Sequence, residues 1–72
     1  MALTKVEAEV TGKVWKIVAN PGDALNPEDP IVIIESMKME IPVMAPRAGT
    51  VSRVLVKEGD PVREGQVVAE LE

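Results

Sequence analysis

The chain has 72 residues, a formal net charge of −4 and a single aromatic residue, Trp15. A chain of this length forms one domain with a small core, and its acidic, aromatic-poor composition argues against nucleic-acid binding, which needs basic patches and stacking rings. Because the sequence contains neither cysteine nor histidine, it excludes disulfides, thiolate and classical zinc sites, and nucleophiles activated by histidine.

The sequence contains no membrane or export signal that we can identify. No apolar run approaches the roughly 20 residues that span a bilayer, and the first residues lack the apolar core of a signal peptide. We therefore expect a cytoplasmic protein with no membrane partner, monomeric as an isolated domain.

Short apolar runs rich in valine and isoleucine follow one another along the chain, separated by glycine and proline turns, and this pattern predicts strands. No segment has helical periodicity over ten residues, and six prolines leave little room for a helix. Small sheets are marginal alone, so two must bury each other's apolar faces. We predict an all-β fold, a flattened barrel or sandwich of two small antiparallel sheets. The expected strands are 5–10, 13–18, 31–35, 39–44, 50–56 and 67–72.

The second half of the chain repeats the first at an offset of 37 residues. Two copies are too few for a solenoid, so we expect a single domain, 1–72, whose copies, about 8–35 and 45–72, are related by a pseudo-two-fold axis. This symmetry predicts that Lys38, between the copies, lies at the end of the domain opposite the termini. Identical pairs include Ala8 with Ala45, Gly12 with Gly49, Val14 with Val51, Gly22-Asp23 with Gly59-Asp60, and Glu35 with Glu72.

The segment around Lys38 predicts an unusual β-hairpin. An apolar run, 31–34, leads into it and a second apolar run, 41–44, follows it. Tight hairpins prefer Asn-Gly or Gly-Gly at their centre because the two central residues need positive φ, and Met37-Lys38 tolerates that geometry poorly. We predict a strained type I′ turn with positive φ at both residues, and such strain points to function.

Three motifs resemble those of the biotinyl domain, the biotin carboxyl carrier module of the biotin/lipoyl attachment family. Glu35-Ser36-Met37-Lys38-Met39 is similar to that family's Glu-Ala-Met-Lys-Met signature, with serine in place of alanine. The paired Gly-Asp turns and the stretch from Ala45 to Val51 resemble family motifs as well. The resemblance covers essentially the whole chain and is closest to the small free-standing biotin/lipoyl attachment proteins.

The resemblance implies that biotin is attached covalently to Lys38 by a biotin protein ligase. It implies a non-catalytic carrier that shuttles carboxyl groups between a biotin carboxylase and a carboxyltransferase. Met37 and Met39 would be flanking recognition residues, and Glu35, Ser36 and Glu40 are candidates for ligase recognition. The residues themselves offer no cluster of base, nucleophile and oxyanion site, so we expect no catalytic residue in the chain.

Other interpretations of the same residues stay open. A lipoyl carrier would have the same fold, although its tip usually reads Asp-Lys-Ala; a protein that accepts either biotin or lipoate is a further possibility, and an unmodified interaction module is the third. Met37 and Met39 could instead fill the core. Trp15 aligns with Ser52 and is therefore expected on the outer face, as sheet cover or as a partner contact.

Several smaller expectations concern turns. We expect Asp23 and Asp60 to be hydrogen-bond partners within their turns and not metal ligands. Glu28 aligns with Gly65, and we expect the turn at Glu28 to differ in shape from the turn at Gly65. The Ser36 hydroxyl is expected to hydrogen-bond the backbone of the hairpin turn.

Overall fold

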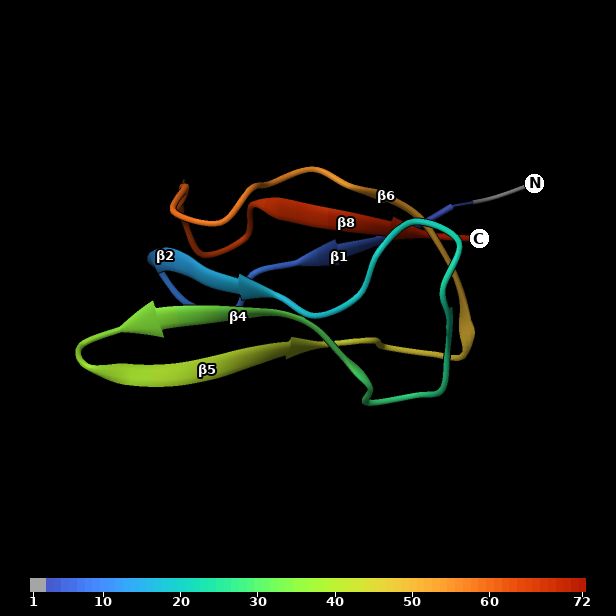
Figure 1. Ribbon diagram of the computed structural model, residues 1–72, viewed down its shortest axis with the longest axis horizontal. Helices are drawn as coiled ribbons and strands as arrows, with labels where there is room; N and C mark the ends of the chain where they lie inside the picture. The colour runs from blue at the N-terminus through green and yellow to red at the C-terminus, as the bar shows by residue number, and fades with distance from the viewer. Residues whose placement is uncertain (1–2) are drawn as a thin grey trace.

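The structure, a computed structural model, describes residues 3–72 as two four-stranded antiparallel sheets packed face to face (Figure 1). The strand order is β1-β8-β6-β3 in one sheet and β5-β4-β2-β7 in the other, which confirms the predicted all-β class. No helix that could cross a membrane occurs in the described range. The strands are β1 (Thr4–Glu7), β2 (Gly12–Ile17), β3 (Ala24–Leu25), β4 (Pro30–Ser36), β5 (Met39–Met44), β6 (Gly49–Val54), β7 (Pro61–Val62) and β8 (Val67–Leu71).

The strands of the two halves correspond to each other at the offset of 37 residues. β2 and β6 match end to end at this offset, and so do β3 and β7. β4 and β8 begin at equivalent positions, and β4 is longer by the two residues that lead into the hairpin tip. The correspondence also reaches β1 and the second part of β5, where only Val6 and Val43 are identical, so the structural repeat extends further than the sequence similarity.

Backbone hydrogen bonds outside the ladders repeat in the same way. The N–H of Gly22 donates to the carbonyl of Val51 (2.8 Å), and the equivalent N–H of Gly59 donates to the carbonyl of Val14 (2.7 Å). Glu28 N–H donates to the Ala45 carbonyl, and Gly65 N–H to the Ala8 carbonyl, both at 2.8 Å. Each half therefore closes a turn onto the other half, which makes the two halves interlock.

The core lies between the sheets and consists of valine, isoleucine, alanine and leucine side chains. Val14 and Val51 occupy equivalent places in it, as do Ile34 and Leu71. Each sheet buries one face, and this two-layer burial supplies the hydrophobic stabilisation that neither small sheet has alone. The buried set is Val6, Ala8, Val14, Ala19, Ile31, Val32, Ile34, Val43, Ala45, Val51, Val56, Val62, Val68, Ala69 and Leu71.

Two expectations about local structure are wrong. The turns were not expected to contain strands, but β3 and β7 form there, because each needs only two residues to pair with β6 or β2. The Glu28 turn does not differ from its partner, since Glu28 adopts φ of 71° and Gly65 φ of 86°. Glu28 adopts the left-handed conformation because the hydrogen bond from its N–H to the Ala45 carbonyl fixes the turn.

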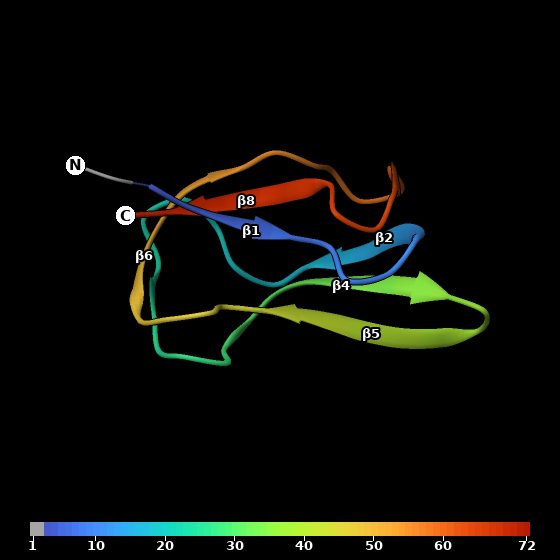
Figure 2. The same ribbon diagram turned by 180° about the vertical axis from the view of Figure 1, so that it is seen from behind.

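The two ends of the molecule differ. The β4–β5 hairpin projects at one end, and Glu72 and the first described residues lie at the other (Figures 1 and 2). The principal extents are 36 × 17 × 17 Å, with the hairpin along the longest axis. The hairpin tip is therefore far from the chain ends, as the pseudo-symmetry predicts.

Candidate functional site

The hairpin tip is a two-residue turn with a left-handed backbone. Ser36 pairs with Met39 across it, and the two central residues, Met37 and Lys38, have φ of 51° and 65°. This confirms the predicted positive φ at both positions. The left-handed backbone costs a residue with a Cβ about 1–2 kcal/mol. The hydrogen bonds and packing of the β4–β5 ladder offset this cost.

The side chains of the tip are exposed to solvent. Met37 is 91% exposed and Met39 62% exposed, while Lys38 between them is also exposed. The alternative that these methionines fill the core is wrong, since exposed methionine contributes nothing to core packing. A primary amine on a long flexible stem thus stands clear of the body, inside a collar of two apolar side chains.

The stem of the hairpin is fastened to the rest of the fold. Ser36 Oγ donates a hydrogen bond to the Thr11 carbonyl (2.9 Å), and Thr11 Oγ1 accepts one from the Glu64 N–H (3.1 Å). The expectation that Ser36 bonds the turn backbone is wrong, because its side chain points toward the neighbouring chain segment. These two hydrogen bonds hold the hairpin in place just behind the tip, so Lys38 is presented on a rigid support.

Gly12 permits a close approach behind the tip. A Cβ at this position would lie 2.3 Å from the Glu35 carbonyl oxygen, a backbone atom that cannot move aside easily. Any larger residue would push β2 away from β4 at the point where the hairpin leaves the body. The glycine therefore lets the stem pack directly against the neighbouring strand.

An acidic pair lies directly behind the tip. Glu35 and Glu40 are opposite each other in the β4–β5 ladder, and Lys13 on β2 is opposite Glu35. Like charges in directly opposed positions destabilise a sheet, so the fold itself does not favour this pair. The pair places negative charge on the surface nearest to Lys38.

Trp15 lies on the same sheet, further from the tip. The ladder between β2 and β4 shifts register between Val14 and Lys16, and Trp15 is the extra residue of this bulge. Its side chain is 47% exposed, as expected from the alignment with Ser52. The indole is therefore about half-exposed at the bulge.

The aspartates of the Gly-Asp turns act as the sequence predicts. Asp23 Oδ2 accepts a hydrogen bond from the Asn20 N–H, and Asp60 Oδ2 accepts one from the Lys57 N–H, both at 2.9 Å. Both carboxylates thus close their own turns. Over residues 3–72, no group of three or more acidic side chains comes close enough together to hold a metal ion.

The described residues of the tip supply an exposed amine, an apolar collar and an acidic pair. The arrangement therefore presents the Lys38 amine at the surface of the protein.

Comparison with known proteins gives consistent matches. The family model described as "Biotin-requiring enzyme" matches residues 2–71. The chain is 46% identical over 66 residues to the biotin/lipoyl attachment protein of Bacillus subtilis, which covers 92% of this chain and 90% of that protein. It is 45% identical over 64 residues to the biotinylated protein TB7.3 homolog of Mycobacterium leprae, with coverage of 89% and 90%.

Among solved structures, the urea carboxylase of Kluyveromyces lactis contains a similar fold. It superposes with a TM-score of 0.95 and 39% sequence identity. The match covers 100% of this chain but 6% of that one. The chain therefore resembles one small part of a large carboxylase, and two small proteins over nearly their whole length.

Proposed function

Because the chain belongs to the biotin/lipoyl family, we propose that it is a biotin carboxyl carrier with the cofactor attached to Lys38. The observation that carries this proposal is the left-handed turn at Met37 and Lys38, which holds a lysine at the most projecting point of the fold. Of the residues named from the sequence, Lys38 alone combines a nucleophilic amine with this position.

In the attachment step, the residues of the chain hold the Lys38 amine in position. The Lys38 amine, once a base of the ligase has taken its proton, attacks the acyl carbon of biotinyl-adenylate. The new amide C–N bond forms as the bond between acyl carbon and phosphate oxygen breaks, and AMP leaves. The rigid stem, with the Ser36 bond to Thr11, keeps the amine in a fixed place relative to the surface that the ligase contacts.

The residues around Lys38 would identify it among the lysines of the chain. Met37 and Met39 offer apolar contacts on both sides of the amine, and exposed apolar side chains contribute strongly when a partner covers them. Glu35 and Glu40 would face basic groups of the ligase. Their unfavourable opposition in the sheet supports a role in recognition and not in stability.

Biotin, when bound, supplies the ureido nitrogen that carries a carboxyl group. The carrier would then serve a biotin carboxylase and a carboxyltransferase, and the tether would raise the concentration of the cofactor at both active sites. The similarity to part of a urea carboxylase, and the carboxyl carrier motif, support partners of this class.

A lipoyl carrier, or a carrier that accepts both cofactors, is the second candidate. It is favoured by one observation, the 46% identity with a protein named for attachment of biotin or lipoate. A lipoyl ligase would need to tolerate the Met-Lys-Met collar, because this chain lacks the Asp-Lys-Ala tip that is usual in lipoyl domains.

Parallel modification by the two ligases separates these candidates. The purified chain is incubated with biotin protein ligase, biotin and ATP, and separately with lipoate ligase, lipoate and ATP, and intact masses are compared. We expect the mass of one biotinyl group in the first reaction and little or no lipoylation in the second. Equal yields in both would identify a dual carrier, and no biotinylation by an active ligase would contradict the proposal.

A further inference from the structure

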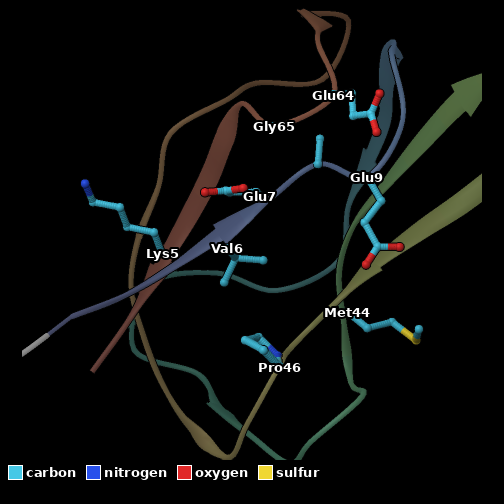
Figure 3. A pocket seen from close by; sticks show the side chains of 9 residues that line it. Lys5, Val6, Glu7, Glu9, Met44, Pro46, Glu64 and Gly65 are labelled. Carbon is cyan, nitrogen blue, oxygen red and sulfur yellow. The ribbon is translucent and has the colours of Figure 1, made fainter.

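A groove of about 450 Å³ lies between the two sheets, along the side of the molecule (Figure 3). It runs between β1 and β5, which are the end strands of their sheets and have a hydrogen-bonded neighbour on one side only. Strand edges of this kind keep unpaired N–H and C=O groups that can pair with another extended chain. The groove is separate from the hairpin tip, and no residue of the Met37-Lys38 turn lines it.

The two walls of the groove differ in chemistry although they are equivalent in the repeat. Glu7 and Glu9 form the wall on β1 and just beyond it, and at the equivalent positions the β5 wall has Met44 and Pro46. Figure 3 shows Glu7 and Glu64 on one side and Met44 and Pro46 on the other, with the Glu9 side chain extending toward Met44. Because the same backbone accommodates either kind of residue, the fold does not require this division into an acidic and an apolar wall.

The carboxylates of the groove outnumber its basic residues. Glu64 adds a third carboxylate, and Lys5 is the only basic residue among those that line the groove. The ion pair found over residues 3–72, Arg53 with Glu70, involves none of the three carboxylates. The apolar wall is accessible too, with Met44 47% exposed.

We propose that this groove binds a basic, extended segment of a partner protein. A segment added along β1 would be four to five residues long, since the strand has four residues. In an extended chain alternate side chains point to opposite sides, so basic residues would meet Glu7, Glu9 and Glu64 while the residues between them lie against Met44 and Pro46. Strand addition with side-chain pockets of this type is a common mode of peptide recognition.

The direction of β5 connects the groove to the tip. β5 runs from Met39 beside the tip to Met44 in the groove. A partner anchored by such a segment therefore has the rest of its body within reach of Lys38, at a raised effective concentration. The binding is electrostatic in part, so it weakens as the salt concentration rises. The inference does not depend on which cofactor Lys38 carries.

Nuclear magnetic resonance titration of the ¹⁵N-labelled chain tests the proposal. The probe is a six-residue peptide of alternating lysine and valine, with a peptide of alternating glutamate and valine as the charge control. We expect shifts of the backbone amides at 5–9, 44–45 and 64–65 with the basic peptide only. The triple variant Glu7→Gln, Glu9→Gln, Glu64→Gln should weaken binding about tenfold or more, because it removes three exposed charge contacts that each contribute up to a few-fold in affinity.

A matched triple variant, Asp23→Asn, Glu58→Gln, Glu72→Gln, has the same change of net charge outside the groove. It should weaken binding by less than about threefold, as expected for distant screened charges. Equal weakening by both variants would show nonspecific attraction and overturn the proposal. So would an absence of binding, or shifts centred on Glu35 and Glu40 at the tip. Groove shifts that depend on protein concentration without peptide would show that a second copy binds there, and would overturn it as well.

Discussion

The two sheets of this molecule have equivalent backbones but differ at the surface. The ladder between β8 and its neighbours places Lys5, Glu70 and Arg53 in one row, and Arg53 Nη2 lies 2.7 Å from a Glu70 carboxylate oxygen. Charged side chains thus cover the outer face of this sheet. A polar outer face of this kind is ordinary for an antiparallel sheet with one buried side.

The equivalent row in the other sheet is less charged. Pro42, Ile33 and Lys16 occupy the places that Lys5, Glu70 and Arg53 take in the first row. Trp15, in the bulge beside Lys16, is aligned with Ser52. Since the same backbone is stable with charged residues at the first two places, Pro42 and Ile33 are not a requirement of the fold. The sheet that carries the hairpin tip therefore exposes more apolar side chain than the sheet that carries the chain ends.

The largest expected effect tests the equivalence of the two cores. Ile34 and Leu71 are fully buried at equivalent positions, so Ile34→Ala and Leu71→Ala should each lower the free energy of unfolding by about 3 kcal/mol. Urea denaturation followed by circular dichroism measures both. The exposed Val18→Ala is the control and should change it by less than about 0.5 kcal/mol. A cost below about 1 kcal/mol for one core position would show that the halves are not energetically equivalent.

The next effect compares the two left-handed turns. Glu28→Gly removes the penalty of a Cβ at φ of 71° and should stabilise the protein by about 0.5–1 kcal/mol. Gly65→Ala should destabilise it by about 1 kcal/mol, although no atom lies within 4 Å of the added Cβ. Thermal denaturation of the two variants gives the signs. Effects of the same sign would contradict a purely conformational difference.

A smaller effect separates stability from recognition at the tip. Asparagine adopts positive φ more readily than methionine, so Met37→Asn should raise the free energy of unfolding by about 0.5 kcal/mol. We expect the rate of biotin transfer to Lys38 to fall severalfold in the same variant, because one side of the apolar collar is lost. Intact mass measurements on samples quenched at successive times give the rate. A more stable variant with an unchanged rate would show that the ligase does not read Met37.

The smallest expected effect concerns Trp15. Ser52 occupies the same bulge in the other half, so Trp15→Ser should change the free energy of unfolding by less than about 0.5 kcal/mol. Differential scanning calorimetry is sensitive enough to measure this. A loss above about 2 kcal/mol would mean that the indole stabilises the sheet, and its exposure would then need no functional explanation.

The sequence was informative where a rule acts locally or repeats. The two apolar runs around Met37-Lys38 predict a β-hairpin centred on these two residues, and a two-residue hairpin turn needs positive φ, so the strained tip could be predicted. The Gly-Asp turns were predictable for the same reason, since the aspartate bonds the backbone three residues earlier in the chain.

Contacts between distant segments could not be predicted in this way. The Ser36 hydroxyl donates a hydrogen bond to the carbonyl of Thr11, 25 residues away, and no local sequence pattern predicts that partner. β3 and β7 are too short to have a periodicity of their own and form because β6 and β2 lie beside them. The groove exists because β1 and β5 end different sheets, and its two walls come from different halves of the chain.

Intact mass measurement after biotin ligation tests whether this fold presents Lys38 as its one attachment site. Wild type, Lys38→Arg and Lys57→Arg are incubated with biotin protein ligase, biotin and ATP; arginine keeps the charge and length of the side chain, and Lys57 lies in the turn that precedes β7. We expect one biotinyl group on wild type and on Lys57→Arg, and none on Lys38→Arg. A biotinyl group on Lys38→Arg would contradict this expectation.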